Sequence, residues 1–423
     1  MDRLLITGGD RLEGTVRISG AKNSALKLMA ASLLAEGRTV IHNVPRIVDC
    51  LTMGEVIEHL GGGVTWQGTT VAIDATELDS VETPYELVRR MRASIIVLGP
   101  LLARYGRARV AMPGGCNIGS RKIDLHIRGL ERMGASFEYE HGYVNVLANE
   151  LQGAFISLDF PSVGATENIM MAAVAAKGTT VIENAAREPE IVDLAHFLAA
   201  MGAHIDGAGT TSIEIAGVDR FVPVEHHVIP DRVEAGTFAI AACGTHGDLF
   251  LEGARADHLD LPLSKLEQAG AEVGTDAGGI TVRMGGRPAS VDFVTLPYPG
   301  FPTDLQPQMM AMLAVARGTS IATENVFESR FMFVDELNRM GADIRTEGHH
   351  AVIRGVDRLS AAPVRSLDIR AGAAMVVAAL QADGTTEITN VYHLDRGYED
   401  LEAKLVALGA RVRRVEERSP AYT

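Results

Sequence analysis

Two short patterns of apolar and polar residues recur along the chain, and each predicts the same element at every copy. In the first, the apolar face of an amphipathic helix leads to a glycine and alternating strand residues follow, which is typical of a helix that ends at a C′ glycine. Its glycines are Gly61, Gly134, Gly202, Gly270, Gly341 and Gly409. In the second, a helix end and a glycine turn precede a short alternating strand. Its glycines are Gly37, Gly106, Gly178, Gly247, Gly318 and Gly384. Both patterns have a period of about 70 residues, which predicts six copies of one α/β unit.

The six copies predict two globular domains of three copies each, because a unit of this size buries its own helices instead of stacking in an open solenoid. The break is expected between the third and fourth copies, in segment 221–236, where Pro223, Pro230 and polar residues suit a crossing between domains. A cleft between two similar halves is a usual place for a ligand, so we expect the active site there.

Composition and charge narrow the class of protein. The chain has 423 residues, of which 47% are hydrophobic and 22% charged, as in globular proteins. A formal net charge of −15 disfavours nucleic acid and anionic membranes as partners, so an anionic ligand needs a few local cations. No apolar run is long enough to predict a membrane span, and the first residues show no secretory signal. Three widely spaced cysteines predict no disulfide framework and favour a reduced cytoplasm.

The stretch MPGGCNIGSRKIDLH, residues 112–126, places one of these cysteines in a glycine-rich, cationic loop. Arg121 and Lys122 favour a thiolate at Cys116, which is therefore a candidate reactive thiol. The alternative is that Cys116 is a small buried hydrophobe. Cys50 and Cys243 lie in apolar helical patterns, so we expect them to be buried and unreactive.

Two further residues are candidates because of their place near predicted helix starts. Lys22 precedes a helix expected to start near Asn23, where free backbone N–H groups favour an anion; a solvated surface lysine is the alternative. Asp304 follows three prolines and precedes a long apolar helix. Either Thr303 or Asp304 is the N-cap of that helix, or Asp304 is a positioned general base.

Three arginines are also expected at helix starts, where a cation is unfavourable for the helix dipole. Arg92 and Arg370 begin apolar helical patterns, and Arg396 precedes a helix rich in acids. They indicate either anion binding or ordinary salt bridges.

Motifs for other chemistries are missing from the sequence. The 13 histidines form no H-x₃-H or HExxH pair, which argues against a metal site. There is no G-x-S-x-G elbow, no dinucleotide glycine motif after a strand and no Walker A loop. Aromatic residues make up only 5% of the chain, without a basic–aromatic patch for nucleic acid.

Eight ordered motifs together resemble the UDP-N-acetylglucosamine 1-carboxyvinyltransferases, which are enolpyruvyl transferases. They are GAKNSAL at 20–26, MRAS at 91–94, PGGCNIGSRKIDLH at 113–126, SVGAT at 162–166, NAAREPEI at 184–191, FPTD at 301–304, NVFESRFM at 325–332 and YHLDRGYE at 392–399. The resemblance runs from residue 3 to about residue 415. It implies an α/β fold of two inside-out α/β barrel domains, each of three repeats. Residues 22–230 would form one domain, and residues 1–21 plus 231–423 the other.

The resemblance also implies a reaction. The enolpyruvyl group of phosphoenolpyruvate would pass to the 3′-hydroxyl of UDP-N-acetylglucosamine through a tetrahedral ketal, with release of phosphate. This is the first committed step of peptidoglycan precursor synthesis. By the same resemblance Cys116 is the proton donor and Asp304 the base.

The remaining site residues follow from the matching motifs. Lys22, Arg121 and Arg396 would hold phosphate and carboxylate charge, and Asn23, Asp368 and Arg370 match further active-site positions. The positions that match contacts to the UDP-sugar are Arg92, Arg121, Lys122, Ile123, Asp124, Leu125, Ser162, Val163, Gly164, Asp304 and Val326.

The partners implied are phosphoenolpyruvate and UDP-N-acetylglucosamine, with no cofactor, metal, nucleic acid or membrane. A monomer or weak homo-oligomer in the cytoplasm is expected. Lys27 stands where many relatives have an apolar residue or proline, and Lys122 where proline is common; neither is a proposed chemical group. Some members have aspartate in place of Cys116, so its presence here predicts sensitivity to fosfomycin.

Three alternatives are open. One is 5-enolpyruvylshikimate-3-phosphate synthase, against which the cysteine loop argues. Another is a non-catalytic UDP-sugar sensor, which would not need both Cys116 and Asp304. The last is a six-repeat ring around nucleic acid, which the net charge of −15 disfavours.

Overall fold

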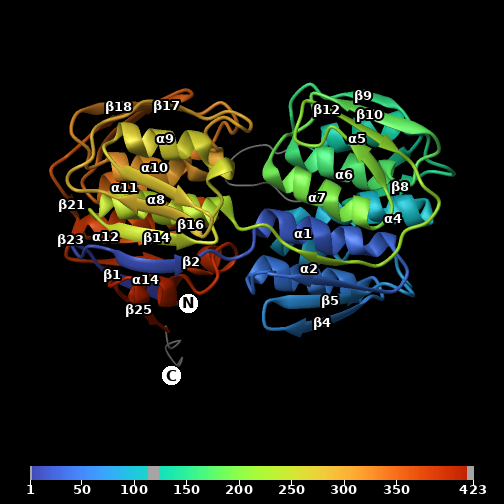
Figure 1. Ribbon diagram of the computed structural model, residues 1–423, viewed down its shortest axis with the longest axis horizontal. Coiled ribbons are helices and arrows are strands. Elements are labelled where there is room, and N and C mark those ends of the chain that lie inside the picture. Colours follow the sequence, from blue (N-terminus) through green and yellow to red (C-terminus); the bar gives the residue numbers. More distant parts are fainter. Residues whose placement is uncertain (1, 113–122, 417–423) are drawn as a thin grey trace. The chain divides into compact units, whose positions relative to one another are not determined.

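A computed structural model describes residues 2–112 and 123–416, apart from the side chains of Arg92 and Ser94. The chain divides into two compact units (Figure 1). Unit 1 comprises the described residues 2–19 and 230–416, and unit 2 comprises residues 20–112 and 123–229. In Figure 1, unit 2 is coloured blue to green, and unit 1 yellow to red with the two blue N-terminal strands.

The described part of unit 2 contains three sheets. Their strand orders are β13–β3–β5–β4, β6–β8–β7 and β11–β12–β10–β9. The strands are β3 (Arg38–His42), β4 (Gly63–Gln67), β5 (Thr70–Asp74), β6 (Arg107–Ala111), β7 (Ser136–Glu140), β8 (Tyr143–Leu147), β9 (Phe155–Ser157), β10 (Thr179–Glu183), β11 (His204–Asp206), β12 (Ser212–Ala216) and β13 (Glu225–His227). The helices are α1 (Lys22–Ala31), α2 (Val48–His59), α3 (Tyr85–Arg90), α4 (Leu98–Tyr105), α5 (Asp124–Arg132), α6 (Val163–Ala173) and α7 (Pro189–Ala200), with 3₁₀ helices η1 (Ser32–Leu34) and η2 (Arg92–Val97).

The described part of unit 1 contains three four-stranded sheets and one strand pair. Their orders are β15–β16–β14–β2, β17–β18–β20–β19, β22–β24–β1–β25 and β21–β23. The strands are β1 (Arg3–Thr7), β2 (Glu13–Arg17), β14 (Asp248–Glu252), β15 (Glu272–Asp276), β16 (Gly279–Arg283), β17 (Phe293–Val294), β18 (Thr319–Thr323), β19 (Asp343–Glu347), β20 (His350–Arg354), β21 (Leu359–Ser360), β22 (Pro363–Arg365), β23 (Ala382–Asp383), β24 (Thr385–Thr389) and β25 (Arg411–Val415). The helices are α8 (Arg232–Gly244), α9 (Asp260–Gln268), α10 (Gln306–Leu313), α11 (Val334–Arg339), α12 (Ile369–Gln381), α13 (Tyr392–Asp395) and α14 (Leu401–Ala407), with 3₁₀ helices η3 (Ala256–His258), η4 (Thr303–Leu305) and η5 (Arg330–Phe333).

One pairing scheme recurs in the sheets of both units. A parallel pair is followed by two antiparallel pairings, as in β2–β14–β16–β15 and β9–β10–β12–β11. The β6 sheet follows the same scheme, since a parallel bridge joins Glu82 to Arg109 of β6. The last sheet of unit 1 is completed by the N-terminal strand, because β1 lies antiparallel between β24 and β25. The predicted repetition of one α/β unit is therefore confirmed in the strand order.

The glycine-marked helix ends and strand starts are also confirmed. All six helix-ending glycines have positive φ, between 92° and 112°, a conformation that favours glycine over residues with a Cβ. The strands β4, β7, β11, β15, β19 and β25 each begin two residues after one of them. The glycines of the second pattern stand directly before β3, β6, β10, β14, β18 and β24.

Each unit is built around helices that are buried on every side. Almost all residues of α1 and α6 in unit 2, and of α8, α10 and α12 in unit 1, are inaccessible to solvent. In unit 1, α8, α10 and α12 pack on one another inside the unit (Figure 1). Their sequences are rich in alanine, glycine and methionine, which lets helices approach closely, and polar side chains within them, such as Gln308, are themselves buried.

Two of the three cysteines lie in helices inside the units. Cys50 in α2 and Cys243 in α8 are buried as predicted, and burial raises the pKa of Cys243 to about 12.

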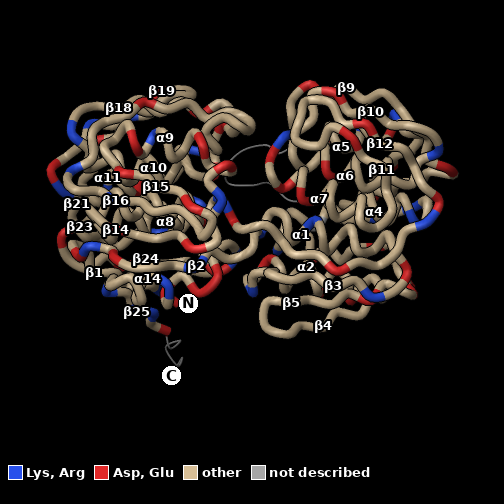
Figure 2. The backbone as a smooth tube through the Cα atoms, in the orientation of Figure 1, with Lys and Arg blue, Asp and Glu red and all other residues tan. Residues whose placement is uncertain are grey.

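Figure 2 shows acidic and basic residues interspersed along both units. Among the described residues, no helix has the length and apolar character needed to cross a bilayer.

Candidate active site

Asp304 in unit 1 is held by two buried arginines. It lies in η4, after the prolines that the sequence places before α10. Its Oδ2 accepts a hydrogen bond of 2.9 Å from Nη2 of Arg370, and its Oδ1 accepts one of 3.1 Å from Nη2 of Arg330. The arginine side chains are 7% and 2% exposed, whereas that of Asp304 is 23% exposed. Asp304 thus keeps contact with solvent while its position is determined from the interior.

The alternative in which Asp304 is the N-cap of the following helix is wrong. Neither η4 nor α10 has a side-chain cap hydrogen bond, and the residue at the N-cap position of α10 is Leu305. The Asp304 side chain instead binds two guanidinium groups. Of the two interpretations, the one in which Asp304 is a positioned carboxylate is compatible with these contacts.

Arg370 stands at the start of α12, as predicted, and Asp368 is the N-cap of that helix. Oδ1 of Asp368 accepts hydrogen bonds from the backbone N–H groups of Arg370 (2.7 Å) and Ala371 (3.0 Å). Burial alone lowers the pKa of Arg370, but Asp304 and other nearby groups outweigh it and raise the pKa above its usual range. The guanidinium is therefore a permanent buried cation.

One donor of Arg370 is unused by the described residues. Nη1 is buried and donates no hydrogen bond to any of them. A Cβ at Gly397, the residue after Arg396, would lie 3.7 Å from it. Buried donors are usually satisfied, so this guanidinium N–H is available to an anionic or carbonyl ligand or to water.

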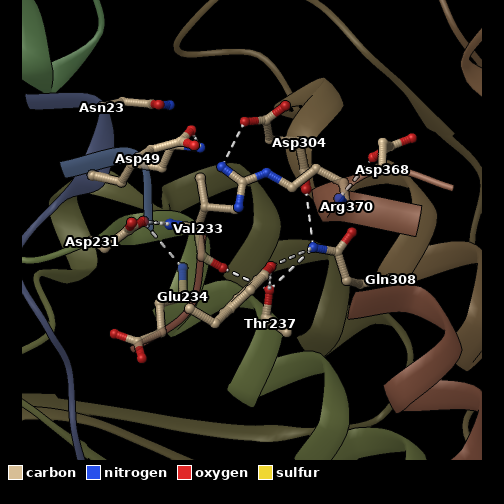
Figure 3. A network of polar contacts seen from close by, with 12 residues as sticks. Asn23, Asp49, Asp231, Val233, Glu234, Thr237, Asp304, Gln308, Asp368 and Arg370 are labelled. Carbon is tan, nitrogen blue, oxygen red and sulfur yellow. Dashed lines mark hydrogen bonds and ion pairs between the residues drawn. The ribbon is translucent and has the colours of Figure 1, made fainter. Parts of the chain in front are cut away.

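A buried polar network supports η4 from below (Figure 3). Nε2 of Gln308 lies within hydrogen-bond distance of the backbone oxygen of Asp304 (3.0 Å), Oγ1 of Thr237 (3.1 Å) and the hydroxyl of Tyr398 (3.2 Å), and its two N–H groups are shared among these three acceptors. The guanidinium carbon of Arg370 lies 5.8 Å from the centre of the Tyr398 ring. Burial raises the pKa of Tyr398, so this hydroxyl is neutral and serves as a hydrogen-bond partner.

Two other predicted residues of unit 1 lie in different settings. Arg396 precedes the acidic helix α14, as predicted, but it lies five residues before the first residue of α14 and is the C-cap of the one-turn helix α13, so it is not at a helix start. A cation at a helix C-terminus is favourable for the dipole, which removes the electrostatic argument made from the sequence. The backbone N–H of Val326 donates to Oε1 of Glu324 at 2.8 Å, and Oε2 of Glu324 accepts from Thr303 at 3.0 Å.

In unit 2, Lys22 is the first residue of α1, one position before the predicted start. Its Nζ lies 2.6 Å from Oδ2 of Asp49 in α2, and both side chains are almost fully buried. The surface-lysine alternative is therefore wrong. Asn23 follows in the same turn, and its backbone oxygen accepts a 2.7 Å hydrogen bond from Nζ of Lys27.

The second central helix of unit 2 adds a buried acid. Glu167 of α6 is fully buried, and its Oε2 lies 3.5 Å from Nζ of Lys27. Burial raises the pKa of Glu167 to about 8, and Lys27 opposes this shift while Glu190 and Glu188 add to it. The local cluster thus holds a lysine and a carboxyl group that is mostly neutral at neutral pH.

The remaining predicted contacts lie at other helix starts of unit 2. Arg92 begins η2, a 3₁₀ segment before α4, and not the apolar α-helix itself. Ser162 is the N-cap of α6, where its Oγ accepts from the backbone N–H of Ala165; Val163 and Gly164 form the first turn. Ile123 is the N-cap residue of α5, and Asp124 and Leu125 follow it, with Asp124 3.7 Å from Arg128.

Three predicted site residues lie outside the described part of the chain: Cys116, Arg121 and Lys122. Their roles stay predictions. Among the residues that are described, no group of three or more His, Cys, Asp or Glu side chains could hold a metal ion.

Within unit 1 the structure brings together Asp304, Asp368 and Arg370, and within unit 2 Lys22 and Asn23. Sequence reasoning missed Arg330, Asp49 and Glu167. Arg330 lies within the NVFESRFM motif, so its place there could have flagged it, whereas the other two carry no local signal.

Comparisons with known proteins indicate the family to which the chain belongs. A family model described as EPSP synthase (3-phosphoshikimate 1-carboxyvinyltransferase) matches residues 6–405. UDP-N-acetylglucosamine 1-carboxyvinyltransferase 2 of Carboxydothermus hydrogenoformans is 55% identical over 99% of this chain and 100% of its own. The UDP-N-acetylglucosamine 1-carboxyvinyltransferase of Corynebacterium jeikeium is 55% identical over 98% of this chain and 99% of its own.

Solved structures extend the comparison. The enolpyruvyl transferase NikO from Streptomyces tendae superposes with a TM-score of 0.89 at 29% identity, covering 98% of each chain. EPSP synthase from Acinetobacter baumannii gives a TM-score of 0.75 at 18% identity over 98% of this chain and 100% of its own, which shows the shared fold alone. The predicted fold class is thereby confirmed. The chain belongs to the enolpyruvyl transferase family, and within it to the UDP-N-acetylglucosamine 1-carboxyvinyltransferases.

Proposed function

We propose that this chain transfers the enolpyruvyl group of phosphoenolpyruvate to the 3′-hydroxyl of UDP-N-acetylglucosamine and releases phosphate. The observation that carries the proposal is the Asp304 carboxylate, bound by Arg330 and Arg370 and still 23% exposed. A base that must act on a sugar hydroxyl has to be ionised, oriented and reachable, and this arrangement supports all three requirements. The relatives at 55% identity carry the name of this activity.

The addition step of the proposed reaction needs two proton transfers, one from the sugar hydroxyl and one to phosphoenolpyruvate. During addition, Asp304 takes the proton of the sugar hydroxyl, whose oxygen bonds to carbon 2 of phosphoenolpyruvate. The thiol of Cys116 delivers a proton to carbon 3, which gives a tetrahedral ketal. During elimination, carbon 3 loses a proton to the Cys116 thiolate, the bond from carbon 2 to the phosphate oxygen breaks, and phosphate leaves with the proton that Asp304 had taken, so that both residues return to their starting states.

The cations have a separate role in the proposal. Lys22, Arg121, Arg370 and Arg396 stabilise phosphate and carboxylate charge, which preorganised donors do best in a site shielded from water. The unused buried Nη1 of Arg370 supports this role. The UDP-sugar is assigned to Asn23, Arg92, residues 121–125, residues 162–164 and Val326, by resemblance to the family.

The proposed organisation of the chain follows the same resemblance. Residues 22–230 and residues 1–21 with 231–423 are proposed as the two functional domains, and the pairing of β1 with β24 and β25 supports the second assignment. We further propose a monomer or weak homo-oligomer in the cytoplasm. The cysteine usage supports that compartment.

Phosphate release from phosphoenolpyruvate, with and without UDP-N-acetylglucosamine, tests the function. We expect release that depends on the acceptor, and a loss of at least about a hundredfold in kcat for Asp304→Ala. Asp292→Ala, a change at an exposed aspartate of unit 1, is the matched control and should keep the parental rate. Binding of the UDP-sugar without phosphate release would favour the sensor, and release that depends on shikimate 3-phosphate would favour the sister enzyme.

A further inference from the structure

The first turn of α1 is held in place from several directions inside unit 2. Nζ of Lys22 pairs with Asp49 of α2, and the hydroxyl of Ser24 donates to the carboxylate of Asp193 in α7. The backbone oxygen of Asn23 accepts a hydrogen bond from Nζ of Lys27, one turn later in the same helix. The first turn of α1 is therefore fixed by three polar contacts in addition to its apolar packing.

The Lys27 side chain also lies close to a buried carboxyl group, that of Glu167. The lysine side chain is 11% exposed, and the carboxylate of Glu167, 3.5 Å away on α6, is fully buried. Neither oxygen of Glu167 accepts a hydrogen bond from the described residues. A buried lysine beside a protonated carboxyl group contributes little net stability, because the cost of desolvating the lysine is not offset by a full ion pair. Its presence in the core of unit 2 therefore calls for a role other than stabilisation.

We propose that Lys27 and Glu167 are a positioning pair for the first turn of α1, where Lys27 orients the Asn23 peptide and adds positive charge next to it. The substrate group that benefits is an anion, phosphate or carboxylate, bound at that turn. Lys27 acts through Asn23, and it does not itself touch substrate. The proposal rests on the proposed function of this turn in binding substrate.

The charge argument depends on the groups that face Glu167. Lys27 on α1 opposes the burial that keeps Glu167 protonated, whereas Glu190 of α7 and Glu188 just before it reinforce protonation. From α5, His126 faces the neighbouring Asn168. Below about pH 8, Glu167 is neutral, so the Lys27 charge is not cancelled and adds to the positive N-terminal end of the helix dipole. Above that pH, ionised Glu167 cancels it.

Steady-state kinetics of Lys27→Met test the pair. We expect the KM for phosphoenolpyruvate to rise about tenfold, with a smaller change in kcat, because a hydrogen bond from a charged donor and one positive charge are lost. Lys27→Arg should recover most of the affinity, since it keeps the cation. Ser32→Ala is the matched control: the buried Ser32 hydroxyl donates to the backbone oxygen of Leu28 at the other end of the same helix. It should leave KM within about twofold of the parent.

Glu167→Gln provides a second test of the proposal if Lys27→Met does not fold. In the parent, we expect the KM for phosphoenolpyruvate to rise several-fold as the pH passes about 8, where Glu167 ionises. The glutamine variant cannot ionise, so its KM should stay low at alkaline pH. An unchanged KM in Lys27→Met, an equal rise in Ser32→Ala, or an identical pH profile in Glu167→Gln would overturn the proposal. Failure of the proposed function is distinct, because the parent would then release no acceptor-dependent phosphate.

Discussion

Nη2 of Arg370 lies 2.9 Å from Oδ2 of Asp304, although the two residues are 66 positions apart in the chain. The contact joins the start of the buried helix α12 to the 3₁₀ turn η4 that precedes α10. Because Asp368 caps α12 at the same point, the helix terminus, the arginine and the carboxylate are joined by hydrogen bonds into one assembly. A carboxylate supported in this way can meet a substrate hydroxyl without first reorganising.

Arg330 is expected to position Asp304 from the other side. In Arg330→Met, the Oδ1 atom of Asp304 loses its buried partner, so the free energy of unfolding should fall by about 2 kcal/mol. The kcat should fall about tenfold because the base is no longer held on both oxygens. Urea unfolding and phosphate release measure the two effects. Arg339→Met, which removes an exposed arginine of α11, is the control and should change neither; a folded Arg330→Met with parental kcat would contradict the prediction.

Substitutions of Asp368 separate its capping role from its charge. Asp368→Ala removes the N-cap of α12 and should lower the free energy of unfolding by about 1 kcal/mol. Asp368→Asn keeps an equally good cap and should preserve stability in urea. If the charge of Asp368 also acts in the reaction, Asp368→Asn loses kcat at full stability. Equal stability of the alanine variant and the parent would show that the cap bonds contribute nothing.

The free energy of unfolding should depend on pH because unit 1 contains a buried carboxyl group, that of Glu234. Burial raises the pKa of Glu234 from 4.5 to about 7, against the lowering effect of Lys404, whose Nζ lies 2.5 Å from Oε1. The folded state thus binds the proton more tightly than the unfolded state. The stabilisation is complete below pH 4.5 and is lost as the pH rises to about 7.

Comparison with Glu234→Gln isolates this effect, because the glutamine does not titrate. The stability of the parent relative to the variant, measured by urea unfolding, should fall between pH 4.5 and about 7 and then level off. A relative stability that increases over this range would contradict the assignment.

Thiol reactivity should distinguish the three cysteines. Cys50 and Cys243 are buried, so alkylation of the native protein should spare both. The sequence predicts that Cys116 reacts, and fosfomycin should block that reaction by modifying the same sulfur. Mass spectrometry should therefore find one alkylated cysteine in the native protein, none in native Cys116→Ala, and three in urea-unfolded parent. Rapid native modification of Cys243 would contradict the buried placement.

Several features were predictable from the sequence because they are local. A glycine that ends a helix needs a backbone conformation that other residues resist, so Gly61 and its five counterparts marked the helix ends and the strand starts. The alternation of apolar residues after each glycine then indicated strands. The period of these signals revealed the repeats, and the ordered motifs indicated the family.

Boundaries and helix starts were predicted less well for a physical reason. The start of α1 was displaced by one residue, and Arg396 proved to follow a helix rather than to begin one. A single arginine near a helix favours either end according to which partners the fold supplies, and the sequence around it does not contain those partners.

The sequence by itself determined the repeated elements, the charge balance and the motifs that indicate the chemistry, because each is written in neighbouring residues. Only the tertiary structure decided that β1 completes the sheet of β24 and β25, that Asp304 binds Arg330 and Arg370, and that Lys27 meets Glu167 inside unit 2. These pairings join distant segments, and they form only when buried helices and sheet edges find their complementary surfaces. Local backbone preference does not specify which distant segments pair.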